Sequence, residues 1–205
     1  MFPQLSRSAR RTALLIALVS AVSLGVQVWH LMSVLERDLA ATLLDMARYF
    51  TILTHVLVVV TFAIVSRPWR NGVSGPWLAA LTLSMVMVGA VYHLLLSELV
   101  DFTGLGWWAD QGLHTIGPLA VFLWWLFHAP KRRLVYADLP IFVMWPSVYA
   151  AYVLGRGAQD GVYPYPFIDL PVIGEAAAAV NLAALLLVFL LGGVAMIAIG
   201  RYADR

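Results

Sequence analysis

Six long apolar stretches, separated by short polar segments, are the feature that most constrains this chain of 205 residues. A bilayer core about 30 Å thick is crossed by a helix of roughly 20 apolar residues. We place the candidate spans at approximately residues 11–32, 49–66, 76–100, 111–128, 139–155 and 175–200. The sequence therefore predicts an all-α fold, a bundle of six transmembrane helices that forms one integral-membrane domain over 1–205.

The composition supports a membrane protein and excludes several other classes. Hydrophobic residues make up 62% of the chain and charged residues 12%, about half of the charged fraction of a typical soluble domain. The basic residues form short clusters between apolar runs, so we predict no nucleic-acid partner. The chain has no cysteine, which excludes disulfides, thiolate metal sites and a cysteine nucleophile.

The direction of the spans follows from the distribution of Lys and Arg over alternate loops. Cytoplasmic loops carry an excess of these residues, and one side receives ten of the thirteen. The other side receives only Arg37, Arg48 and Arg156. Both termini are therefore expected in the cytoplasm. The apolar run after Arg11 is too long for a cleaved signal peptide, so we expect a retained anchor.

Three histidines, His55, His93 and His114, lie in the outer halves of predicted spans. Ionisable groups are costly inside a membrane and commonly mark functional sites. Thr51 precedes His55 by one helical turn and shares its face. From the rise of 1.5 Å per residue, Thr51 and His114 lie roughly 3 Å and 5 Å inside the outer boundary. The two meet if the second and fourth spans are neighbours, although a membrane threonine more often bonds its own backbone.

Two outer loops have unusual composition. The segment "DGVYPYPFIDLP" at 160–171 combines rigid prolines with Tyr163, Tyr165 and Phe167, which suits either a lid that lines a substrate site or an anchor at the lipid interface. Tyr92 has the same two interpretations. The segment "ERDLAATLLDMAR" at 36–48 is expected to form an interfacial helix with leucines on its apolar side.

Three strings carry a resemblance to a known family. "RYFTILTHVLVVVTF" at 48–62, "QGLHTIGPLAVFL" at 111–123 and "GVYPYPFIDL" at 161–170 resemble the androgen-induced-protein family of multi-pass membrane hydrolases, most closely its bacterial branch. The resemblance implies a bacterial inner-membrane enzyme that hydrolyses fatty acid esters of hydroxy fatty acids or similar acyl esters. It implies Thr51 as the nucleophile and His114 as its partner.

The chemistry assigns further residues to this site. A histidine can take the proton of a threonine hydroxyl and return it to the leaving group. Asp110, one turn before His114, is the candidate for orienting the imidazole, and His55 or His93 could donate to the oxyanion. Thr54 is a rival nucleophile, because the bacterial pattern often has a Ser-Asn pair where this chain has Thr54 and His55. No cofactor or metal is expected, and the partner is a membrane lipid or acyl-ester substrate near the outer face.

Two other functions remain open from the residues alone. His55 and His93 lie at similar depths on different spans, as the two ligands of a haem or metal in a membrane electron carrier would. A small transporter ranks last, because the spans lack deep acidic or basic residues and show no matching pair of broken helices.

Overall fold

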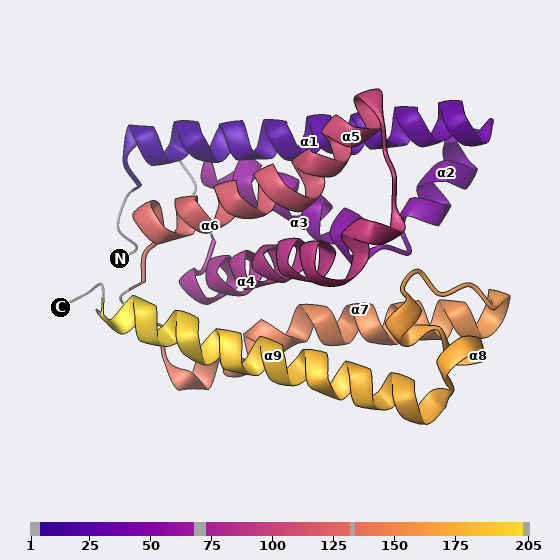
Figure 1. Ribbon diagram of the computed structural model, residues 1–205. Coiled ribbons are helices and arrows are strands. Elements are labelled where there is room, and N and C mark those ends of the chain that lie inside the picture. Colours follow the sequence, from indigo (N-terminus) through magenta and orange to yellow (C-terminus); the bar gives the residue numbers. More distant parts are fainter. Residues whose placement is uncertain (1–4, 68–72, 132–133, 203–205) are drawn as a thin grey trace. The chain divides into compact units, whose positions relative to one another are not determined.

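The computed structural model describes residues 5–67, 73–131 and 134–202. These residues are helical or in loops and turns, and no strand occurs among them (Figure 1). The predicted all-α class is therefore confirmed. The chain divides after Pro130 into two compact units, and each is described by itself.

The first unit begins with a long helix and a short one, and three further helices follow them. Its helices are α1 (Arg7–Leu35), α2 (Leu39–Met46), α3 (Phe50–Val65), α4 (Gly75–Val91) with the π-helical turn η1 (Tyr92–Leu96) and the 3-10 turn η2 (Ser97–Leu99), then α5 (Gly104–Gln111), the π-helical turn η3 (Gly112–Ile116) and α6 (Gly117–His128). Because α5, η3 and α6 follow one another without a break, they form a single helix over 104–128, termed the site helix below.

The second unit is built on two long helices. Its elements are η4 (Tyr136–Asp138), α7 (Leu139–Asp160), η5 (Pro166–Ile168), α8 (Leu170–Ile173) and α9 (Glu175–Tyr202). Helix α7 continues through Pro146 and ends at Gly161, whose φ of 74° is the left-handed conformation that suits glycine. Helices α7 and α9 pack against each other, with Gly193 of α9 in contact with Leu139 and Phe142.

Side-chain caps explain where three helices begin. The hydroxyls of Ser6 and Ser74 and the carboxylate of Asp38 accept the free backbone N–H groups of α1, α4 and α2. Such caps satisfy donors that have no partner within the helix. Each of the six predicted spans coincides with a helix, but the fourth begins at Gly104 rather than near residue 111, and the fifth extends to Asp160.

Four of the described helices are long and apolar enough to cross a membrane, namely Arg7–Leu35, Gly75–Leu99, Tyr136–Asp160 and Glu175–Tyr202. A fifth span results if α2 and α3, which meet at a bend of 98°, are taken together. The site helix is not among these candidates. The structure is therefore compatible with a multi-pass membrane protein. The segment at 36–48 contains the expected short helix, and Leu39, Leu43 and Leu44 are exposed on it.

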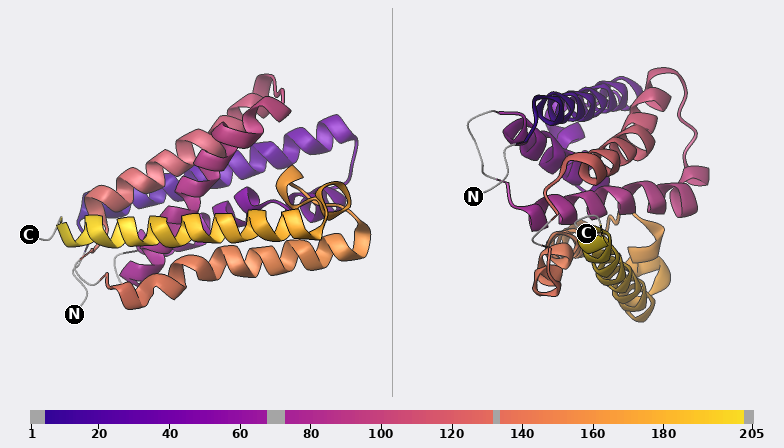
Figure 2. Two further views of the ribbon diagram at one scale, coloured as in Figure 1. Left: turned by 60° about the horizontal axis from the view of Figure 1, so that its bottom comes forward. Right: turned by 90° about the vertical axis from the view of Figure 1, so that its left-hand side faces the viewer.

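The helices of the first unit lie side by side and alternate in direction (Figures 1 and 2). Helix α1 packs against α3 and along the site helix, and α4 packs against both α3 and α6. Consequently α3 and the site helix run in the same direction. Glycine permits the close approach: a Cβ atom on Gly89 of α4 would lie 3.2 Å from the backbone oxygen of His114.

Gly117 is a position where this close approach can be tested. A Cβ atom there would lie 2.5 Å from Cε1 of the His55 ring and 2.9 Å from the Gly112 carbonyl oxygen. We expect Gly117→Ala to lower the free energy of unfolding by about 1–3 kcal/mol, because overpacking displaces its neighbours. Gly25→Ala is the matched control, since nothing lies within 4 Å of that position. Unfolding of both variants in detergent by a denaturant series measures the difference, and equal stabilities would contradict this packing.

Candidate active site

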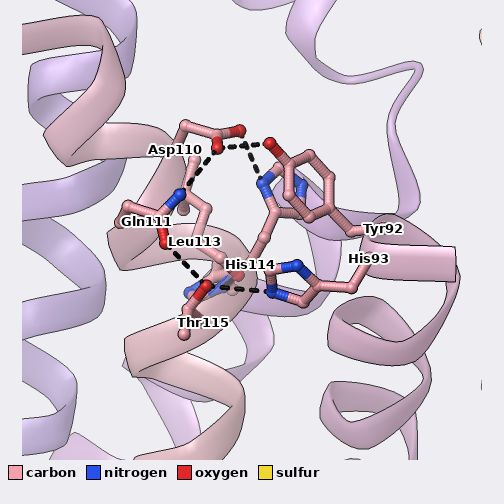
Figure 3. A network of polar contacts seen from close by, with 8 residues as sticks. Tyr92, His93, Asp110, Gln111, Leu113, His114 and Thr115 are labelled. Carbon is pink, nitrogen blue, oxygen red and sulfur yellow. Dashed lines mark hydrogen bonds and ion pairs between the residues drawn. The ribbon is translucent and has the colours of Figure 1, made fainter. Parts of the chain in front are cut away.

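The centre of the candidate site is a carboxylate–imidazole pair on the site helix. Nδ1 of His114 lies 2.8 Å from Oδ1 of Asp110, one helical turn earlier (Figure 3). The Asp110 side chain is 3% exposed and that of His114 is 17% exposed. A carboxylate only accepts hydrogen bonds, so the ring proton lies on Nδ1 and the lone pair on Nε2. Among the described residues, Nε2 of His114 has no hydrogen-bond partner. The pair therefore offers an oriented imidazole with a free basic nitrogen.

The local sequence explains why the helix widens at His114. Pro118 has no backbone N–H and cannot bond the carbonyl four residues earlier, which is that of His114. Gly117 instead bonds the carbonyl of Gly112, five residues earlier, and residues 112–116 form the π-helical turn η3. Single π turns within α-helices occur frequently at functional sites. The same widening occurs in α4 at η1, which begins with Tyr92 and His93.

Tyr92 connects the two widened turns. Its ring stacks on the His114 ring, with centroids 3.9 Å apart and planes 8° from parallel. Its hydroxyl donates to Oδ2 of Asp110 at 2.5 Å. Tyr92 is buried and contacts both members of the Asp110–His114 pair, and its predicted place in the lining of a substrate site stays a prediction.

A further chain of hydrogen bonds runs from the surface to Asp110. The Thr115 hydroxyl donates to Oε1 of Gln111 at 2.9 Å, so it can only accept from Nε2 of His93, 3.0 Å away. Nε2 of Gln111 in turn lies 3.5 Å from Oδ2 of Asp110. His93 is exposed and its Nε2–H is used by Thr115, so it is not placed as an oxyanion donor.

Thr51 lies on the buried face of α3, and this face packs against η3. His55, one turn later on that face, places its Nε2 2.8 Å from the carbonyl oxygen of Leu113, the residue before His114. Thr51 precedes His55 by one helical turn and therefore lies about 6 Å from it along the axis of α3. Because α3 and the site helix run in the same direction, this displacement is toward the level of Asp110. The face of α3 that carries Thr51 therefore packs against η3, the turn that contains His114, and the meeting of the two side chains stays a prediction. No hydrogen bond joins the two side chains in the described residues.

The Thr51 hydroxyl differs from a structural threonine of a membrane helix. Thr82 of α4 bonds the Leu78 carbonyl at 2.7 Å, as such residues usually do. Thr51 forms no side-chain hydrogen bond within the described part of the chain, and its side chain retains 9% exposure. Thr54 is fully buried. Of the two threonines, Thr51 is the more accessible to a substrate.

His55 and His93 do not face one another across the bundle. His55 contacts Leu113 and Gly117, which lie one turn apart on one face of the site helix. His93 bonds Thr115, which is two residues from each and therefore lies on the opposite face. This arrangement does not favour the haem-binding alternative. No group of three or more metal-ligating side chains occurs within residues 5–67, 73–131 and 134–202.

The three aromatic residues of the segment at 160–171, Tyr163, Tyr165 and Phe167, belong to the second unit. Tyr165 and Phe167 stack with centroids 5.2 Å apart, and the Tyr163 ring covers Gly157 of α7. The Phe167 carbonyl accepts a hydrogen bond from Asn181 of α9 at 2.9 Å. The loop therefore contacts both α7 and α9, and its predicted role as a lid that lines a substrate site stays a prediction.

The hydroxyl of Tyr92 provides a test of the buried network. Tyr92→Phe should lower the free energy of unfolding by about 1–3 kcal/mol, because Asp110 then loses a donor while the ring stack is retained. Tyr152→Phe is the control: its hydroxyl accepts from Arg156 on an exposed surface at 3.0 Å, where a hydrogen bond contributes little. Thermal unfolding in detergent compares the two. Equal losses of stability in the two variants would show that the hydrogen bond from Tyr92 to Asp110 does not stabilise the protein.

Comparisons of the chain with protein families, with curated proteins and with solved structures found no match.

Proposed function

We propose that the chain is a multi-pass membrane hydrolase of lipid acyl esters, with Thr51 as nucleophile and His114 as general base. The observation that carries the proposal is the Asp110–His114 pair, because it leaves Nε2 of an oriented imidazole free in η3, the turn against which α3 packs the face that bears Thr51. The resemblance of residues 48–62 and 111–123 to the androgen-induced-protein family supports the same pair.

The reaction proceeds in two balanced steps. In the first, Nε2 of His114 takes the proton of the Thr51 hydroxyl as Oγ1 bonds to the ester carbonyl carbon. The tetrahedral intermediate then breaks its bond to the alcohol oxygen, which receives the proton from His114. In the second step, water gives a proton to His114 and attacks the acyl-threonine, and the carboxylic acid leaves as Thr51 regains its proton.

Each neighbour of the reactive pair has a defined task. Asp110 fixes the imidazole in the tautomer with Nε2 unprotonated and balances the charge that the ring acquires. Tyr92 and Gln111 direct hydrogen-bond donors at the carboxylate. The surrounding surface is apolar, with Leu94, Leu95 and Leu99 exposed near η1, which suits an acyl chain better than a water-soluble ester.

The proposed substrate class, a long-chain ester, follows from the position that we propose for the site near the outer membrane face. A site a few ångströms inside the headgroup boundary presents a polar end to water and apolar walls to lipid, so a long-chain ester can enter from the bilayer. We propose that both termini are cytoplasmic and that the reactive pair faces outward in a bacterial inner membrane. Substituted-cysteine labelling at residues 36 and 98 (outer) and 7 (cytoplasmic) in intact cells tests this orientation.

The function itself is tested with purified protein in mixed micelles. We expect release of fatty acid from long-chain esters of secondary alcohols, and covalent reaction with an alkyl fluorophosphonate whose adduct maps by mass spectrometry to the peptide that contains Thr51. Failure to hydrolyse any ester from short to long chain, together with no adduct, would refute the proposal.

A further inference from the structure

Three polar atoms of the first unit are completely buried and have no hydrogen-bond partner among the described residues. They are Ser20 Oγ and Gln27 Oε1 on α1, and His55 Nδ1 on α3. Leaving a buried donor or acceptor unsatisfied costs about 1–3 kcal/mol per group. Three such atoms on two helices that pack together require a common explanation.

The three side chains lie along the seam where α1, α3 and η3 meet. Ser20, Ser23 and Gln27 share one buried face of α1 because their spacing is three and four residues. Ser23 contacts Gly112 at the start of η3, and the His55 ring covers Gly117 just after η3. Ser20 lies about 4–5 Å nearer to the N-terminus of α1 than Ser23, which brings it to the level of His55.

The chemistry of the unpaired atoms defines what can satisfy them. A carbonyl only accepts, so His55 uses its Nε2–H on Leu113, and its Nδ1 in the neutral ring is an acceptor. Oε1 of Gln27 is also an acceptor, and the Ser20 hydroxyl can donate or accept. The missing partner must donate hydrogen bonds to Gln27 Oε1 and His55 Nδ1, and it must accept one where the Ser20 hydroxyl donates. An acyl chain can do neither, whereas a water molecule does both.

We propose that the seam between α1, α3 and η3 binds ordered water, held by Ser20, Gln27 and His55. Gln27 and Ser20 are seven residues apart, or about 10 Å along α1, so more than one molecule is needed to reach both. Globular proteins hold on the order of one buried water per 27 residues, usually on otherwise unsatisfied polar groups. This inference goes beyond the proposed function and does not depend on it.

X-ray radiolytic footprinting tests the proposal on the intact protein in micelles. Radiolysis of ordered water produces hydroxyl radicals that oxidise the adjacent side chains even where bulk solvent has no access, and mass spectrometry locates the products. We expect His55 to be oxidised at least fivefold faster than Phe62, an equally buried ring of similar reactivity two turns further along α3. Equal and slow oxidation of His55 and Phe62 would overturn the proposal.

A water-displacing variant sharpens the test. Ser20→Val replaces the hydroxyl with a methyl group and adds a second one, so oxidation of His55 should fall to the rate of Phe62. Ser33→Val on the exposed part of the same helix is the matched control and should leave the rate unchanged. Unchanged oxidation of His55 in folded Ser20→Val protein would also overturn the proposal. If that variant does not fold, the wild-type comparison of His55 with Phe62 decides alone.

Discussion

Replacing His114 by alanine is expected to lower the rate of acyl-ester hydrolysis by about 10³-fold, within the range that a positioned general base contributes. The variant loses the group that accepts the Thr51 proton, and Asp110 loses one of its hydrogen-bond partners. Initial rates of fatty acid release in mixed micelles, normalised to folded protein by size-exclusion chromatography, measure the effect.

His128→Ala is the matched control for this experiment. His128 is the last residue of α6, and among the described residues its ring lies tilted against that of Trp124, with centroids 6.0 Å apart. Its replacement should leave the rate within about twofold. Asp110→Asn should fall between the two, because the imidazole is then held without a negative charge. Hydrolysis by the His114 variant at the rate of the control would show that His114 is not the base.

Thr51→Ala is expected to remove both turnover and the fluorophosphonate adduct, because no other hydroxyl on the buried face of α3 is as accessible. Thr51→Ser should retain part of the activity, since the hydroxyl remains and only a methyl group is lost. Residues that act as one unit have non-additive effects. The double variant with His114→Ala should therefore be no slower than the slower single variant.

Thr54→Ala separates the two candidate nucleophiles. Thr54 lies one turn along α3 and is fully buried, so its replacement should preserve the adduct even if it reduces stability. An adduct that survives in Thr51→Ala and disappears in Thr54→Ala would assign the nucleophile to Thr54. An adduct that survives in both variants would exclude a threonine of α3 altogether.

The parts of the fold that depend on local sequence are the parts that sequence reasoning predicted well. An apolar run of about 20 residues and a capping Ser or Asp act within one helix, so each predicted span coincides with a helix, and four of these helices are long and apolar enough to cross a membrane. The contact between Asp110 and His114 was predicted for the same reason, since residues four apart on a helix are neighbours.

The residues that sequence reasoning missed depend on packing between helices. The contacts of Tyr92 with Asp110 and of His93 with Thr115 require the widened turns η1 and η3 to face each other. A signal for η3 is present in the sequence, because Pro118 follows His114 by four residues and removes its regular backbone partner. The start of the site helix at Gly104 was not predicted for another reason, because Asp110 and Gln111 interrupt its apolar run.

The low hydropathy of the site helix has a consequence for assembly of the protein in its membrane. A translocon releases a segment into lipid according to its average polarity, and an aspartate disfavours release, by about 2.5–3.5 kcal/mol at the centre of such a segment and by less toward its ends, where Asp110 lies. The site helix, which bears Asp110, is not among the helices long and apolar enough to cross a membrane, whereas Gly75–Leu99, which carries Tyr92, is. Insertion of the two as a preassembled hairpin would shield the carboxylate from hydrocarbon, so the hydrogen bond from Tyr92 to Asp110 would also serve biogenesis.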